Sequence, residues 1–146
     1  MKRILNFRSS TEHYLSDACV VWCFDARFTD LLDELLVAKH WRNIDLIKVA
    51  GGAKALSSPE NAEERNFILG QIAKSITLHK AARVALMVHA ECGAYSKHFD
   101  DPKEERLFYE SEAKKAGDII RAFLAKGNLS IEIISLVADF DGLWQA

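Results

Sequence analysis

Two segments of the chain have the same residue pattern: ACVVWCFDAR at residues 18–27 and VALMVHAECG at residues 84–93. Each begins with an apolar run, Ala18 to Trp22 in the first and Val84 to Val88 in the second, and each ends in residues that can carry chemistry. A short apolar run of this kind is typical of a buried strand. Because the carboxyl ends of parallel strands meet at one edge of a sheet, we expect the residues after both runs to lie close together.

Helices and strands alternate along the rest of the chain. Ile44 to Val49 and Ile131 to Val137 predict two further strands. Three helices are expected between the strands. The first has an apolar stripe from Phe28 to Leu36, and the last has one from Tyr109 to Leu124. The long helix between them is capped by Ser58, has Pro59 at its first position and runs to about Lys80.

This alternation predicts an α/β fold, with a mostly parallel four-stranded sheet in the order 2-1-3-4 flanked by helices. A chain of 146 residues is long enough for one core, so we expect a single α/β domain over residues 1–146. In the order 2-1-3-4 the winding reverses between the first and third strands. Ligands of open α/β sheets bind at such a point, beyond the carboxyl ends of the strands.

Cys23, His89 and Cys92 follow those two strands. Two thiolates and one imidazole are three of the four ligands that a tetrahedral zinc ion takes, and water or Asp25 could fill the fourth position. The alternative is that both cysteines are small buried side chains and that His89 is a core histidine. Three soft ligands at matching strand ends are not a packing pattern, so the sequence favours a Zn²⁺ site.

At these residues the chain resembles the β-class carbonic anhydrases. That family has Cys-x-Asp-x-Arg after its first strand, here Cys23 to Arg27, and His-x-x-Cys-Gly after its third, here His89 to Gly93. Val49 to Gly52 and Asp139 to Gly142 resemble the segments after its second and fourth strands. The resemblance implies that Cys23, His89 and Cys92 are the zinc ligands, with a catalytic pair formed by Asp25 and Arg27. It also implies a lyase in which zinc-bound hydroxide hydrates CO2 reversibly to bicarbonate, and a homodimer or higher homo-oligomer.

The chain also departs from the family pattern. The region before the first strand is about seventeen residues, shorter than the family's helical arm, and the Asn of the Ala-Gly turn is absent, since Lys48 and Val49 precede Ala50. The tail after Asp141 is brief, so we expect the family's extra edge strand and C-terminal helices to be missing. Two alternatives therefore stay open: a non-catalytic zinc-binding or regulatory protein, and a hydrolase of a related substrate such as carbonyl sulfide or carbon disulfide.

Asp25 has two possible roles. Paired with Arg27, its carboxylate could hold the zinc-bound hydroxide in a reactive orientation. If that pairing breaks, the carboxylate could turn to the metal, expel the water and close the site. The alternative to both roles is an ordinary salt bridge between Asp25 and Arg27 that supports the loop.

Composition narrows the function classes. A net charge of −2 gives no electrostatic reason to expect nucleic acid or an anionic membrane as a partner, and no apolar stretch is long enough to span a bilayer. The basic N-terminus lacks the apolar core of a signal peptide, and three cysteines fit a reducing environment, so we expect a cytoplasmic protein.

Four further residues are worth naming. Cys19 is interpreted as a buried strand cysteine, with a redox role beside Cys23 as the alternative. Tyr95 and His98 could line the entrance of the site or shuttle protons, and Glu91 is assigned no role.

Overall fold

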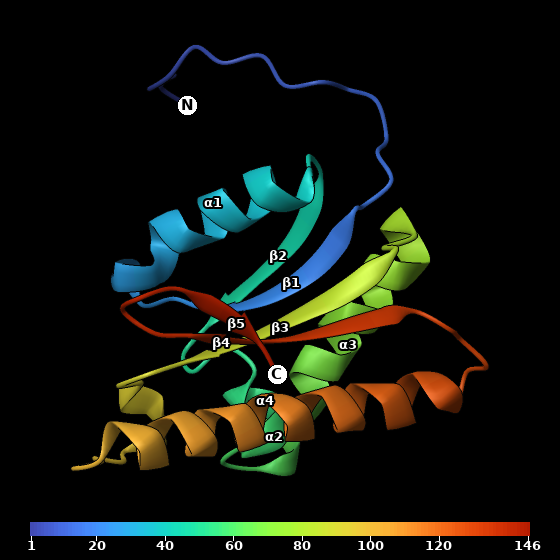
Figure 1. Ribbon diagram of the computed structural model, residues 1–146. Helices are drawn as coiled ribbons and strands as arrows, with labels where there is room; N and C mark the ends of the chain where they lie inside the picture. Colours follow the sequence, from blue (N-terminus) through green and yellow to red (C-terminus); the bar gives the residue numbers. More distant parts are fainter.

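The computed structural model describes residues 1–146 and contains one sheet with helices on both faces (Figure 1). The strands are β1 (Ala18–Cys23), β2 (Ile44–Val49), β3 (Arg83–His89), β4 (Glu132–Ala138) and β5 (Leu143–Gln145). The helices are α1 (Thr29–Lys39), α2 (Lys54–Ser57), α3 (Ala62–His79) and α4 (Pro102–Ala125), with one-turn 3-10 helices η1 (Ala26–Phe28) and η2 (Gly93–Tyr95). No helix is both long enough and apolar enough to cross a membrane.

The sheet order is β2-β1-β3-β4-β5, and β1 to β4 are parallel, which confirms the expected fold. The fifth strand is a correction: β5 pairs antiparallel with β4, so the edge strand that we expected to be missing is present. Asp139 makes this return possible, because its carboxylate accepts hydrogen bonds from the backbone N–H groups of Asp141 and Gly142 and closes the turn.

The central strands are buried because their sequences are apolar on both faces. Every residue of β1 is buried, as are all residues of β3 except Arg83. In Figure 1, α1 covers one face of the sheet, while α2, α3 and α4 cover the other. This arrangement follows from the strand order. The crossover from β1 to β2 and the crossover from β2 to β3 run in opposite directions across the sheet, so right-handed connections place their helices on opposite faces. The carboxyl ends of β1 and β3 are thereby left open between two layers of helices.

The expected start at Ser58 and Pro59 of the helix that runs to about Lys80 is wrong. Residues 54–57 already form the short helix α2, and α3 begins only after Asn61, whose side chain accepts a hydrogen bond from the backbone N–H of Glu64. Asn is a strong N-cap, whereas Ser58 is the C-cap of α2, so Ser58 and Pro59 lie in the connection between the two helices.

Residues 1–15 form no helix or strand and are exposed. Figure 1 shows most of this segment arching away from α1 and the sheet. Tyr14 is its anchor, because its hydroxyl donates to the Asp45 carboxylate at 2.6 Å and its ring lies 4.4 Å from that of His79.

Candidate metal centre

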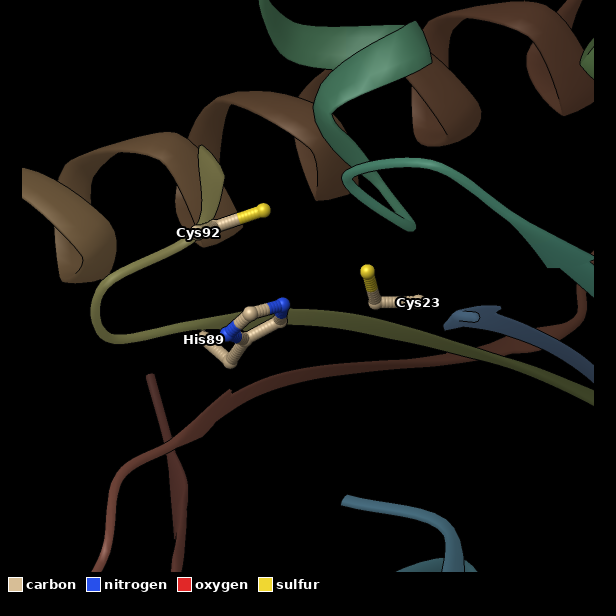
Figure 2. Close-up of side chains that lie close together, drawn as sticks. All are labelled: Cys23, His89 and Cys92. Atoms are coloured by element: carbon tan, nitrogen blue, oxygen red, sulfur yellow. The ribbon is translucent and has the colours of Figure 1, made fainter. Parts of the chain in front are cut away.

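Cys23, His89 and Cys92 lie together at the carboxyl edge of the sheet. Cys23 ends β1, His89 ends β3, and Cys92 stands in the loop before η2. The two sulfurs and a ring nitrogen all lie within 4.8 Å of one another, and Figure 2 shows the three side chains converging on one space. All three residues are buried, with exposed fractions of 3%, 0% and 2%.

The His89 ring is oriented as a metal ligand would be. Its Nδ1 lies 2.8 Å from the carbonyl oxygen of Ala90, and because a carbonyl only accepts, Nδ1 must carry the proton. Nε2 then holds a lone pair, and it is a fully buried atom with no hydrogen-bond partner. A buried unpaired nitrogen is costly unless something binds it. The carbonyl contact is the kind that fixes the tautomer and orientation of a metal-bound histidine.

Each of the two cysteines strongly shifts the pKa of the other. The neighbouring Cys92 thiol and then, against desolvation, contacts with His89 lower the pKa of Cys23. The contact with Cys23, together with burial, raises the pKa of Cys92. These surroundings favour the thiolate form of Cys23, which is the form that binds a metal ion. Two cysteine sulfurs and a free imidazole nitrogen form a donor set that fits zinc.

Asp25 and Arg27 form a bidentate ion pair beside the three side chains. Arg27 Nη2 donates to Asp25 Oδ2 at 2.8 Å, and Arg27 Nε lies 3.1 Å from both carboxylate oxygens. Asp25 also caps η1, because its Oδ1 accepts from the backbone N–H of Arg27 at 3.0 Å. The side-chain bond to Arg27, acting against desolvation, lowers the pKa of Asp25 to about 2, so the carboxylate is ionised at neutral pH. Asp25 Oδ2 lies 4.0 Å from His89 Nε2.

Glu91 also contacts Arg27, a role that the sequence analysis did not assign. Its carboxylate oxygen lies 3.2 Å from Arg27 Nη1, and its backbone carbonyl accepts from Arg27 Nη2 at 3.3 Å. Glu91 has a φ of 53°, and its backbone N–H donates to Glu105 at 2.8 Å. The only signal in the sequence was an acidic residue between two predicted ligands. That position alone could not reveal its partner.

Aromatic rings and a tyrosine hydroxyl support the site. The Phe28 ring lies 4.5 Å from the His89 ring, and Phe140 lies 5.7 Å from Phe28. The Tyr109 hydroxyl accepts from the backbone N–H of Cys92 at 3.1 Å, which fixes the position of that cysteine. A cavity of about 350 Å³ opens between α4 and the loop after β4, and Ala90, next to His89, is one of its lining residues.

The remaining candidates lie elsewhere. Tyr95 is 9% exposed, and its hydroxyl lies 3.4 Å from Ser57 Oγ, so it packs in the interior rather than at an entrance. His98 is exposed and lies 3.6 Å from Asp100. Cys19 is fully buried, and desolvation raises the pKa of its thiol to about 11, which matches a buried strand cysteine.

Comparison with known proteins identifies the family. Residues 15–140 match the family described as "Putative carbonic anhydrase". No curated protein matches the sequence. Among solved structures, the chain is similar to a tetrameric beta-carbonic anhydrase of the filamentous ascomycete Sordaria macrospora, with 14% identity, a TM-score of 0.56, and coverage of 90% of this chain and 81% of the other.

Two further structures show the same likeness. Beta-carbonic anhydrase isoform I of Trichomonas vaginalis is 15% identical, with a TM-score of 0.55 and coverage of 96% of this chain and 87% of the other. The β-carbonic anhydrase CafA of Aspergillus fumigatus is 12% identical, with a TM-score of 0.53 and coverage of 91% and 76%. Identities this low show a shared fold only. Because the family match spans residues 15–140, this chain belongs to the family described as "Putative carbonic anhydrase", and the solved structures show that it has the fold of the β-carbonic anhydrases.

Proposed function

We propose that the protein is a zinc-dependent carbonic anhydrase that converts CO2 and water reversibly to bicarbonate. The observation that carries the proposal is the unpaired, buried Nε2 of His89, which lies 4.0 Å from the Asp25 carboxylate, on a ring that has a nitrogen within 4.8 Å of both cysteine sulfurs. Cys23, His89 and Cys92 would hold the zinc ion. When bound with one open position, zinc supplies an acidified water as the nucleophile.

Asp25 is the group that would orient this water. Its carboxylate is ionised, because the pKa of Asp25 is lowered to about 2, and it can therefore only accept hydrogen bonds. By accepting a hydrogen bond from the nucleophile, Asp25 would direct an oxygen lone pair toward the carbon of CO2. Arg27 holds the carboxylate by two of its nitrogens and keeps it from rotating.

Phe28 and Phe140 would supply the apolar part of the substrate site. Their rings lie 5.7 Å apart, and Phe28 packs against His89. CO2 has no net dipole and accepts only weak hydrogen bonds, so an aromatic wall beside the nucleophile suits it. Bicarbonate is an anion, and the Arg27 guanidinium beside the Phe140 ring, 5.3 Å away, would offer it a cation as it leaves.

The protein is also proposed to form homo-oligomers and to work in a reducing, cytoplasmic environment. Ile4, Leu5 and Phe7 are exposed on the N-terminal segment, and such apolar side chains favour burial against a partner. The similar enzyme of Sordaria macrospora is described as tetrameric. The three cysteines are free thiols, and two of them must stay reduced to bind a metal.

Stopped-flow measurement of CO2 hydration tests the proposed activity. We expect the zinc-loaded protein to be active, with a rate that rises over roughly pH 6 to 9 as the nucleophile ionises. Protein stripped with a chelator and the variant Cys92→Ser are the controls, and both should be inactive. A zinc-loaded protein that hydrates no CO2 at any of these pH values would overturn the proposal in favour of a non-catalytic zinc protein or another substrate.

A further inference from the structure

Glu91 occupies a strained position between two of the proposed metal ligands. It is one of five non-glycine residues with positive φ, at 53°, and it is the only one of them that lies between His89 and Cys92. L-amino acids avoid this region because the Cβ crowds the backbone, so the conformation persists only where contacts hold it.

Three contacts hold Glu91, one at each of its polar groups. Its backbone N–H donates to Glu105 Oε1 at 2.8 Å, which ties the loop to α4. Its backbone carbonyl accepts from Arg27 Nη2 at 3.3 Å. Its carboxylate oxygen lies 3.2 Å from Arg27 Nη1.

Arg27 is therefore divided between two partners. Nε and Nη2 bind Asp25, whereas Nη1 and the second contact of Nη2 go to Glu91. The guanidinium is planar, so an anchor at Nη1 also fixes the direction in which Nε and Nη2 face Asp25. Without Glu91, the outer end of Arg27 would keep only its contacts with the rings of Phe28 and Phe140, at 5.8 and 5.3 Å.

The orientation of Arg27 matters because the Asp25 carboxylate lies close to the metal ligands. Asp25 Oδ2 is already 4.0 Å from His89 Nε2, so a small rotation would bring it into the ligand set. A carboxylate is itself a zinc ligand. The hydrogen bonds from Arg27 hold the Asp25 carboxylate out of that position.

We propose that Glu91 is a positioning residue. From its place between His89 and Cys92 it anchors Arg27, so that Asp25 stays paired with Arg27 and the fourth metal position stays open. This inference rests on the proposed metal site. The pair of Arg27 and Glu91 is exposed, with exposed side-chain fractions of 45% and 62%. Exposed pairs contribute little to stability, but a small bias is enough to shift an equilibrium between two carboxylate positions several-fold.

The test is the binding of azide to the cobalt-substituted protein, followed by the visible absorption of Co²⁺ at one fixed pH. Azide needs the fourth position, so its apparent Kd reports how often Asp25 occupies that position. We expect Glu91→Ala to weaken azide binding about three- to tenfold. Loss of a negative charge would by itself strengthen the binding of an anion, so the expected change has the opposite sign to the electrostatic effect.

Two further variants decide the interpretation. The double variant Glu91→Ala/Asp25→Asn should regain azide binding at least as tight as in the Asp25→Asn single variant, because the competing carboxylate is gone. Glu104→Ala, which removes an exposed charge near the start of α4, should bind azide like the wild type. Unchanged azide binding in Glu91→Ala, or a loss that Asp25→Asn does not restore, would overturn the proposal. Wild-type protein without sulfur-to-cobalt absorption would overturn the metal centre itself, and the role of Glu91 with it.

Discussion

Gly52 lies directly against the backbone of Cys23. A Cβ added to Gly52 would stand 2.9 Å from the Cys23 nitrogen and 2.4 Å from the carbonyl oxygen of Met87. Gly52 also has a φ of 57°, and the neighbouring Ala53 N–H donates to the same Met87 carbonyl at 2.9 Å. The turn after β2 is thus packed onto β1 and β3 where the proposed metal ligands begin, and only glycine permits this approach.

Gly52→Ala should therefore destabilise the protein by about 2–5 kcal/mol, since both the positive φ and the backbone clash must be relieved. Zinc affinity should fall as well, because the shift displaces the end of β1. Chemical denaturation and zinc titration measure both effects. Gly70→Ala is the matched control: Gly70 lies in α3 with no atom near its added Cβ, so this change should stabilise the protein by about 0.5–1 kcal/mol.

Cys92→Ser should lose most of the bound zinc, whereas the wild type should hold about one zinc ion per chain. The variant should also gain less stability from added zinc, because metal binding is linked to folding. Cys19→Ala is the control and should keep its zinc, since Cys19 is a neutral thiol whose pKa is raised to about 11 by burial. Elemental analysis that finds Cys92→Ser fully loaded with zinc would exclude Cys92 as a ligand.

Asp45 should make stability fall in acid. Desolvation raises its pKa, but hydrogen bonds from Ser75, Tyr14 and His79 outweigh this effect, and the folded-state pKa is lowered. Asp45 therefore stabilises the fold above the unfolded-state pKa of about 4, and this stabilisation is lost as the pH falls through the lower, folded-state pKa.

Asp45→Asn should thus cost about 1–3 kcal/mol at neutral pH, and its difference from the wild type should shrink below about pH 4. Urea denaturation at several pH values measures this dependence. Asp33→Asn, an exposed change on α1, should stay within about 0.5 kcal/mol of the wild type. A difference between Asp45→Asn and the wild type that is independent of pH would count against the ionised Asp45 network.

Light scattering at micromolar concentration should find a dimer or a larger oligomer. Replacing Ile4, Leu5 and Phe7 together by serine should weaken the assembly, because these exposed side chains lie on a segment that makes few contacts within its own chain. A monodisperse wild-type monomer would contradict the proposed self-association.

The four parallel strands could be predicted because each is a short segment rich in apolar residues that is followed by a turn or loop. Val84 to Val88 and Ile44 to Val49 differ from the observed strands by no more than one residue at either end. The start of α3 was wrong because Ser58 and Pro59 resemble a helix start, whereas Asn61 provides the actual cap. The strand β5 was missed because Leu143–Gln145 has no pattern of its own and forms only by pairing with β4.

The convergence of Cys23, His89 and Cys92 could be predicted from topology, since both strands end at the same edge of the sheet. Their binding of zinc and the catalytic roles of Asp25 and Arg27 stay predictions. The contact between Arg27 and Glu91 could not be foreseen. It joins two loops that are distant in the sequence and depends on a positive φ at Glu91 that its residue type does not indicate.

The rate of CO2 hydration by Asp25→Asn, compared with the wild type at equal zinc content, tests the central claim most directly. If Asp25 orients the nucleophile, the variant should keep its zinc and lose at least about tenfold in kcat/KM, which corresponds to about 1.4 kcal/mol. The contradicting result is a zinc-loaded wild type that is inactive at every pH, together with an Asp25→Asn variant that binds zinc more weakly. Asp25 would then be the permanent fourth ligand of a closed site.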